Sequence, residues 1–203
     1  MILNIKSRDI FTFLSVIVIV TLSYFYVDRD LAIYYKYSDA LFKNFFKTIT
    51  DLGKSEWYII PSLVLFFVFK KYGKLLYARY ALYIFTTNVV AGIGVWLLKF
   101  PFGRYRPRVF FENGDYGFSW FAIGHNYVSF PSGHSITIMT TVTAFALLFP
   151  RYKIPLLFVG AVIAFSRVGM GAHYLSDVIM GSYLGIVVAI VLYHRMIRNY
   201  KVD

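Results

Sequence analysis

The sequence predicts an all-α integral membrane protein, a six-transmembrane-helix bundle with an amphipathic interfacial helix in the first outer loop. Of its 203 residues, 59% are hydrophobic and only 15% are charged, whereas a soluble domain carries about a quarter charged residues. The apolar residues gather in six runs that are separated by polar connections. Because backbone groups must be hydrogen-bonded internally in lipid, we expect these runs to be helices.

The six apolar runs define the spans expected in a single membrane domain over residues 1–203. A membrane helix needs roughly 17–25 apolar residues, and the shorter runs qualify because too little polar surface remains to cover them. The first run ends in Tyr24-Phe25-Tyr26-Val27. It lacks the small residues at which a signal peptidase cleaves, so we interpret it as an uncleaved span. The expected spans are residues 10–27, 56–70, 77–98, 133–149, 154–169 and 176–197.

The positions of lysine and arginine predict the orientation of these spans. On the side that holds both ends of the chain, the cations are concentrated in short segments beside the spans, as the positive-inside rule expects of a cytoplasmic side. We therefore expect cytoplasmic termini and outward-facing connections at residues 28–56 and 99–131. The cations of the cytoplasmic side are Lys6, Arg8, Lys70, Lys71, Lys74, Arg79, Arg151, Lys153, Arg195, Arg198 and Lys201.

Residues 30–54 of the first outer connection have the pattern of an amphipathic helix that lies in the membrane interface. Four lysines are spaced so that they would form one stripe on a helix, with apolar side chains largely on another side. The alternative is a surface helix with a solvated basic side. The lysines are Lys36, Lys43, Lys47 and Lys54, and the apolar residues are Leu41, Phe42, Phe45, Phe46, Ile49 and Leu52.

The net charge of +11 and the absence of cysteine restrict the partners and the chemistry. A basic soluble protein would suggest nucleic acid, but this apolar content favours a lipid bilayer and an anionic substrate at its surface. Without cysteine, no disulfide, thiolate zinc site or cysteine nucleophile can form. We expect no nucleic-acid partner. No oligomer is required, because Gly181 and Gly185 suit helix packing within the bundle.

Three polar clusters interrupt the apolar chain where the outward connections meet the spans. The first contains Lys99 and Arg106, the second is the segment 131–134, and the third extends from Arg167 to Asp177. The six-span topology places all three clusters at the same membrane face, so they can converge there.

The cations of these clusters predict an anion site. Lys99, Arg106 and Arg167 would repel one another unless an anion lay between them. The arginine fork matches phosphate oxygens, and lysine supplies a compact charge. Ser132 and Gly133 precede a helix start, where free N–H groups also favour an anion.

The histidines predict the chemistry at that anion site. His173 and Asp177 are four residues apart, so on a helix they share a face. A carboxylate on one imidazole nitrogen fixes the tautomer and leaves the other nitrogen as a nucleophile, and His134 can protonate a leaving oxygen. A structural hydrogen bond between His173 and Asp177 is the alternative. Two histidines among cations do not suit a metal hydrolase, so we expect no metal or cofactor.

At these residues the sequence resembles the type 2 phosphatidic acid phosphatase superfamily of histidine-dependent lipid phosphatases. Its signatures K-x6-R-P, P-S-G-H and S-R-x5-H-x3-D all occur with their spacing kept, and the similarity covers roughly residues 57–192. The resemblance implies a phosphohistidine on His173, His134 as general acid and Asp177 as the residue that orients His173. The phosphate ligands that it implies are Lys99, Arg106, Ser132, Gly133 and Arg167, without metal.

The resemblance leads us to expect a lipid-phosphate phosphatase in a bacterial inner membrane, with its site facing the periplasm. The segment Asp51-Leu52-Gly53-Lys54 and the compact loops resemble the lipid A 1-phosphatase branch. Undecaprenyl diphosphate and phosphatidylglycerophosphate phosphatases are the alternatives within the family. From another class, the alternative is a non-catalytic phosphate- or lipid-binding membrane protein or transporter. A transporter would show repeats and broken helices, whereas these polar groups lie at helix ends.

Two further arginines flank Arg106, and one further histidine lies in the same outer connection. We interpret Arg104 and Arg108 as additions to the positive potential of the site, with direct phosphate contact as the alternative. We interpret His125 as a loop residue.

Overall fold

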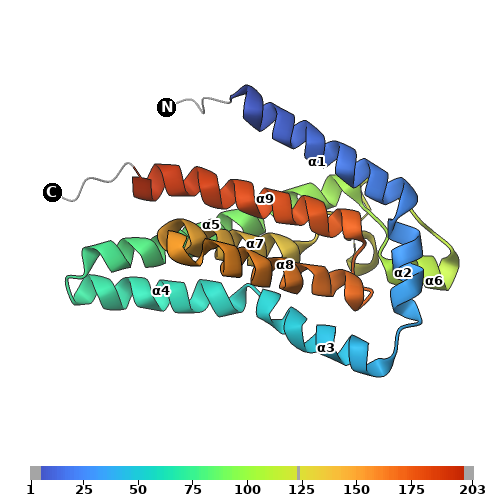
Figure 1. Cartoon of the computed structure of the whole chain (residues 1–203), viewed down its shortest axis with the longest axis horizontal. Helices are drawn as coiled ribbons and strands as arrows, with labels where there is room; N and C mark the ends of the chain where they lie inside the picture. Colours follow the sequence, from blue (N-terminus) through green and yellow to red (C-terminus); the bar gives the residue numbers. More distant parts are fainter. Residues whose placement is uncertain (1–5, 123, 199–203) are drawn as a thin grey trace.

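The computed structural model describes residues 6–122 and 124–198, and this part of the chain is almost entirely helical (Figure 1). One isolated β-bridge joins Arg104 and Phe118 within it. The elements are α1 Ser7–Tyr26, α2 Asp28–Lys36, α3 Ala40–Thr50, the 3-10 turn η1 Asp51–Gly53, α4 Glu56–Lys71, α5 Leu75–Phe102, α6 Pro107–Asn113, η2 His125–Tyr127, α7 Gly133–Leu148, η3 Pro150–Tyr152, α8 Lys153–Gly169, α9 Leu175–Tyr193 and the π-helical turn η4 His194–Arg198.

Six of these helices, α1, α4, α5, α7, α8 and α9, lie over the six expected spans. Five segments are long and apolar enough to cross a membrane: Ser7–Tyr26, Ala40–Lys71, Leu75–Phe102, Pro150–Gly169 and Leu175–Arg198. The remaining helix, α7, has 16 residues and is mostly buried, because it packs against α5, α8 and α9. The bundle therefore has a short central helix that is surrounded by longer helices.

Apolar side chains cover the outer surface of these longer helices. Phe11 of α1 is 72% exposed, and Trp96 of α5 is 76% exposed. Such a surface is stable in lipid, where the helical backbone is satisfied internally and the side chains contact acyl chains. The expectation of a membrane bundle is confirmed.

The first outer connection forms two helices, α2 and α3, in place of one continuous helix over residues 30–54. A new helix begins after Asp39, because its side chain accepts a hydrogen bond from Phe42 N at 2.7 Å and caps α3. α3 is the amphipathic helix of this connection, with Phe46 buried against the bundle. The four lysines consequently lie on two helices and a turn, so the single stripe expected from their spacing is wrong.

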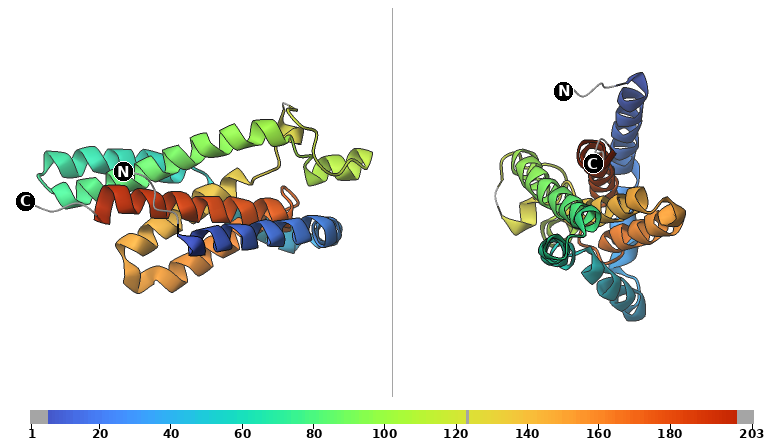
Figure 2. Two further views of the ribbon diagram at one scale, coloured as in Figure 1. Left: turned by 90° about the horizontal axis from the view of Figure 1, so that it is seen from above. Right: turned by 90° about the vertical axis from the view of Figure 1, so that its left-hand side faces the viewer.

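The two ends of the bundle differ in character (Figures 1 and 2). The start of α1, the tight α4–α5 and α7–α8 connections and the end of α9 lie at one end. At the other end lie α2, α6 and the connection that precedes α7, and we call this the loop end. All three polar clusters of the sequence lie at the loop end.

Close packing of α9 on α7 aligns the two helices whose starts carry the second and third clusters. A Cβ added at Gly181 would lie 2.6 Å from Ser132 O, and one added at Gly185 would lie 2.5 Å from Ile136 O. The two glycines thus serve contacts within the bundle, as expected from the sequence.

Candidate active site

The first cluster is placed by the end of α5. Lys99 lies in the last turn of this helix, and Gly103 ends it with a φ of 52° while its N–H donates to Lys99 O at 3.2 Å. Glycine suits this left-handed conformation, and a Cβ here would collide with Ser119 O. Arg106 follows as the N-cap of α6, whose first residue is Pro107. The turn therefore brings Arg106 back beside Lys99.

The second cluster begins α7. The Ser132 hydroxyl accepts hydrogen bonds from Ser135 N at 3.4 Å and from the Ser135 hydroxyl at 2.8 Å, so it caps the helix. Gly133 and His134 form the first turn. Ser132 N donates to Asp177 O at 3.1 Å. This helix start is thereby fixed to the start of α9.

The third cluster joins α8 to α9. Arg167 lies in the last turn of α8, and Asp177 is the third residue of α9. The spacing of His173 and Asp177 predicts that they share a helical face, but α9 begins only at Leu175, so His173 lies in the preceding turn. The two still meet, because Asp177 Oδ2 accepts from Tyr174 N at 2.9 Å and lies 3.4 Å from His173 Nδ1.

Lys99, Arg106 and Arg167 converge at this site, and we call them the cation group. Lys99 lies within electrostatic range of both arginines, and a Cβ at Gly133 would be 3.9 Å from Lys99 Nζ. His134 lies within electrostatic range of all three cations, and His173 lies within range of the two arginines. The structure therefore brings together every residue that the sequence assigns to the site.

Within the described residues, no member of the cation group forms an ion pair with a carboxylate. Arg167 Nη1 donates to Thr50 Oγ1 at 3.0 Å, and Arg106 Nη1 donates to Ala172 O at 3.4 Å. The Nε atoms of both arginines are buried and have no hydrogen-bond partner in the described part of the chain. Buried cationic donors without a counter-ion are suited to an anionic ligand.

Asp177 is held by donors on several sides. It is fully buried, and its carboxylate accepts a hydrogen bond from the Ser129 hydroxyl at 2.6 Å and another from Arg104 Nη1. Ser129 Oγ also lies 3.4 Å from His173 Nδ1. A carboxylate fixed in this way holds the imidazole in one orientation.

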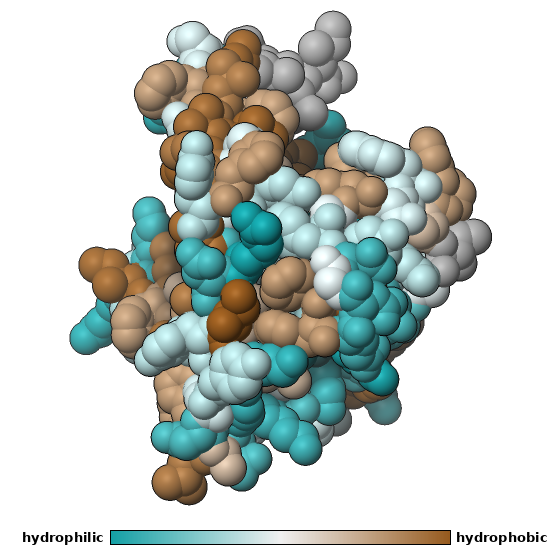
Figure 3. All heavy atoms as spheres, turned by 90° about the vertical axis from the view of Figure 1, so that its right-hand side faces the viewer, coloured by the Kyte–Doolittle hydropathy of each residue, from teal (hydrophilic) through white to brown (hydrophobic). Residues whose placement is uncertain are grey.

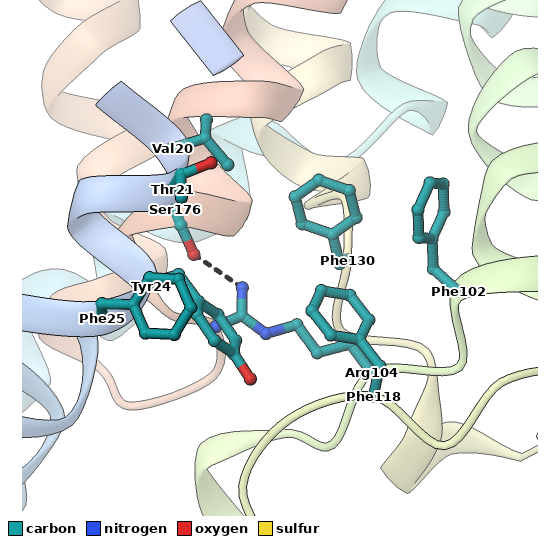
Figure 4. A pocket seen from close by; sticks show the side chains of 9 residues that line it. All are labelled: Val20, Thr21, Tyr24, Phe25, Phe102, Arg104, Phe118, Phe130 and Ser176. Atoms are coloured by element: carbon teal, nitrogen blue, oxygen red, sulfur yellow. Dashed lines mark hydrogen bonds between the residues drawn. The ribbon is translucent and has the colours of Figure 1, made fainter. Parts of the chain in front are cut away.

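Arg104 belongs to a different group of charges from Arg106. Its side chain is fully buried and pairs with Asp28 at 2.7 Å on one side and with Asp177 on the other. Arg104 Nη1 also donates a hydrogen bond to the Ser176 hydroxyl at 2.6 Å, which Figure 4 shows among the aromatic side chains around the guanidinium. We call Asp28, Arg104 and Asp177 the charge cluster. The interpretation of Arg104 as an addition to the positive potential of the site is wrong, because two carboxylates neutralise it.

Arg108 lies outside both groups. It is exposed and pairs with Glu112 on the next turn of α6, at 2.7 Å. Its position is that of a solvated surface residue.

The environment of His173 keeps its imidazole neutral. Burial, helped by the Arg106 and Arg167 cations and opposed by Asp177, lowers the pKa of His173 to about 3. The ring is therefore unprotonated near pH 7. With Nδ1 facing Asp177, Nε2 is the nitrogen that retains a lone pair for attack.

A cavity of about 570 Å³ reaches His134 from between α4 and α5. Its lining includes Glu56, Ile59 and Ile93. Gly53 of η1 packs directly on the imidazole, since a Cβ there would lie 3.2 Å from His134 Cδ2. In Figure 3, which looks onto the loop end, hydrophilic side chains lie between smaller apolar patches.

Sequence reasoning did not identify four residues that support the site: Asp28, Thr50, Gly53 and Ser129. Two of them had a local signal, because Ser129 lies just before the segment 131–134 and Gly53 lies in the segment 51–54. Thr50 contacts Arg167 across 117 positions, and Asp28 contacts Arg104 across 76. No local pattern could have shown these two contacts.

Comparisons with known proteins agree with the motifs and the fold. The model of the PAP2 superfamily matches residues 76–201. Two curated proteins named lipid A 1-phosphatase, from Rhizobium etli and Rhizobium johnstonii, are each 40% identical to this chain, over 157 and 155 residues. These matches cover 72% and 70% of this chain, and they span 68% and 63% of the length of the two relatives.

A solved structure shares the architecture. The crystal structure of a transmembrane PAP2-type phosphatidylglycerolphosphate phosphatase from Bacillus subtilis matches with a TM-score of 0.58 over 95% of this chain and 98% of that chain. At 16% sequence identity, the likeness concerns the fold.

Proposed function

Because the chain belongs to the PAP2 superfamily, we propose that this multi-pass membrane lipid phosphatase removes the 1-phosphate of lipid A through a phosphohistidine on His173. The observation that carries the proposed chemistry is a buried, neutral His173, held by Asp177, that faces the cation group. The choice of lipid A is supported by the names of the two Rhizobium relatives.

In the proposed mechanism, the cation group binds the phosphate of the lipid. Lys99 supplies a compact charge, while the two arginines offer Nε donors that have no other partner among the described residues. The N–H groups at Gly133 and His134 add the positive end of the α7 dipole. The bound phosphate dianion offsets the mutual repulsion of the three cations, so its binding also balances the charge of the site.

The first chemical step is an in-line attack of His173 Nε2 on phosphorus. The bond between phosphorus and the lipid oxygen breaks, and His134 donates its proton to that oxygen. The imidazole of His173 becomes cationic as the P–N bond forms, and the Asp177 carboxylate stabilises it.

The second step releases inorganic phosphate. Water attacks phosphorus, the P–N bond breaks, and His134 takes the proton of the water. Neutral His173 and protonated His134 are regenerated, so the two steps balance without a metal or a cofactor.

We propose that the protein resides in a bacterial inner membrane with the loop end in the periplasm and both termini in the cytoplasm. The support is the distribution of cations in short segments at the opposite end of the bundle. These residues include Lys70, Lys71, Arg151, Lys153 and Arg195.

Phosphate release from purified protein in detergent tests the substrate. Lipid A, undecaprenyl diphosphate, phosphatidylglycerophosphate and phosphatidate are supplied at equal concentration. We expect kcat/KM for lipid A to exceed the others by at least about tenfold, since additional headgroup contacts are worth on the order of 1–3 kcal/mol. Preference for another lipid contradicts the lipid A assignment alone. Binding without release from any lipid would support the non-catalytic alternative.

The role of His134 has a separate test. His134→Ala should slow release from a lipid phosphate far more than release from nitrophenyl phosphate, because a general acid matters most for a basic leaving oxygen. Equal slowing for the two substrates would contradict the proposed proton transfer.

A further inference from the structure

The charge cluster contains a carboxylate for which the proposed mechanism has no use, Asp28 at the start of α2. Its side chain is fully buried. It accepts hydrogen bonds from Arg104 Nη2 at 2.7 Å, from the Ser23 hydroxyl at 2.9 Å and from Ser176 N at 3.0 Å. Asp28 thus reaches the site through Arg104, which bonds to Asp177 with its other terminal nitrogen.

The formal charges of the cluster leave one negative charge in excess, because two carboxylates share one guanidinium. Burial of all three side chains means that water screens this charge little. His173 beside it is neutral before the reaction and carries one positive charge once Nε2 is bonded to phosphorus. The excess charge of the cluster therefore matches the charge that the first chemical step creates.

We infer that Asp28 is a positioning residue for this reaction: by occupying Arg104, it leaves Asp177 its negative charge toward His173. The inference rests on the proposed phosphohistidine mechanism. Without Asp28, Arg104 would pair with Asp177 alone, and that pair would be neutral. The cationic imidazole would then lose most of its counter-charge in a site that already holds three other cations.

This role predicts unequal effects on the two chemical steps. Formation of the phosphohistidine creates the cationic imidazole, so the counter-charge accelerates it. Hydrolysis of the phosphohistidine removes the same positive charge, so the counter-charge gives this step no advantage. A purely structural role, in which Asp28 only ties α2 to α9 and to the loop before α6, would slow both steps alike.

Rapid-quench single turnovers of Asp28→Asn with phosphate-labelled lipid test the inference. We expect formation of labelled phosphohistidine to slow by at least about tenfold, with hydrolysis not slowed and KM within about twofold of wild type. Exposed Asp30 lies on the same helix, so Asp30→Asn is the matched control and should behave as wild type. Equal slowing of both steps, or of neither, would overturn the inference.

Ser176→Ala tests whether the charge of Asp28 or the hydrogen bonds around it produce the effect. This change removes hydrogen bonds to both Asp28 and Arg104 but no charge. We expect it to slow phosphohistidine formation by less than about threefold, as for loss of a neutral hydrogen bond within a charge pair that stays intact. A loss as large as that of Asp28→Asn would show that contact matters and would contradict the charge role.

A double variant keeps the inference testable if Asp28→Asn does not fold. Asp28→Asn combined with Arg104→Gln leaves Asp177 as the sole charge of the cluster, so the excess of one negative charge is restored. We expect phosphohistidine formation within about tenfold of wild type in any folded double variant. A larger loss would overturn the inference. Absence of labelled histidine in wild type would instead refute the proposed function itself.

Discussion

Arg104 and Arg106 are two residues apart in the chain, yet they lie in opposite electrostatic environments. Arg104 is enclosed by Asp28 and Asp177 in the charge cluster. Arg106 is partly buried and meets a backbone carbonyl and no carboxylate among the described residues. Arg104 is fully buried and Arg106 is partly buried, yet the Nε atom of each is removed from water. What distinguishes them is whether the protein itself supplies the counter-charge.

This difference identifies which charges stabilise the fold and which are available to bind an anionic ligand. A buried ion pair is costly to break, because removal of one member leaves an uncompensated charge. Buried cations without a counter-ion repel one another, so the folded protein becomes more stable when an anion binds. Removal of the arginine of the charge cluster should therefore lower stability, whereas removal of a member of the cation group should lower substrate turnover without loss of stability.

The largest effect is expected at His173, which lies between the two groups. His173→Ala should reduce phosphate release by about 10⁴-fold or more, because loss of a nucleophile removes the covalent route. The melting temperature should stay close to that of wild type. Residual activity above a few per cent would show that the nucleophile lies elsewhere. His173 would then not be the residue on which the charge cluster and the cation group act together.

The two arginines provide the direct test of the comparison. Arg106→Ala should lower kcat/KM by about 10²–10³-fold, as expected for loss of one charged donor to the transferred phosphoryl group. Its thermal stability should not fall, since one of three repelling cations is gone. Arg104→Ala should instead lower the free energy of unfolding by about 3–5 kcal/mol, because two buried carboxylates lose their partner.

Thermal melting and phosphate release, both measured on Arg106→Ala and Arg104→Ala, test whether the two arginines have these different roles. If both variants lose stability to the same degree, the cation group is structural after all. Arg108→Ala is the control, because that residue is exposed and pairs only with Glu112 in the described structure.

A smaller effect should follow from crowding His134 beside the cation group. Gly53→Ala would place a Cβ 3.2 Å from His134 Cδ2, so the imidazole must shift by a few tenths of an ångström. We expect kcat to fall by about tenfold for lipid substrates, since misplacement by 1 Å can cost about 10²-fold. Gly94→Ala, which would add a Cβ in open space, should leave kcat unchanged. Unchanged kcat in Gly53→Ala would show that the ring has room to move.

The smallest effect concerns charges outside both groups. We propose that Lys36, Lys43 and Lys47 attract anionic headgroups to the loop end, each by on the order of 1 kcal/mol. Their joint replacement by Gln should raise KM for an anionic lipid by a few fold at low salt and leave kcat unchanged. The difference should shrink as ionic strength rises. The same change at Lys70 and Lys71, at the other end of the bundle, should leave KM unchanged, and equal effects would contradict the local role.

The sequence predicts the spans and the convergence of the three motifs because both are local properties. Apolar runs report membrane helices, and the motif spacing fixes which residues leave each helix end together. The break between α2 and α3 was also present in the sequence. Ser38-Asp39 before an apolar segment is a helix N-cap signal, and Asp39 does cap α3.

The supporting contacts could not be predicted in the same way. Arg104 lies inside the six unspecified positions of the first signature, and nothing near it reveals that Asp28 is its partner. Such pairs depend on how α1 and α2 pack beside α9, which is a property of the whole bundle. The sequence therefore predicts the reacting groups better than the residues that hold them.

The bond from Ser176 N to Asp28 Oδ1 joins positions 148 residues apart, and this separation has a consequence for synthesis. Ribosomes add roughly 5–20 residues per second, so Asp28 emerges several seconds before Arg104 and about 7–30 s before Ser176. During that interval its carboxylate lacks one or both of the partners that come later in the chain, Arg104 and Ser176. The charge cluster is consequently complete only after the start of α9, which carries Asp177, has been synthesised.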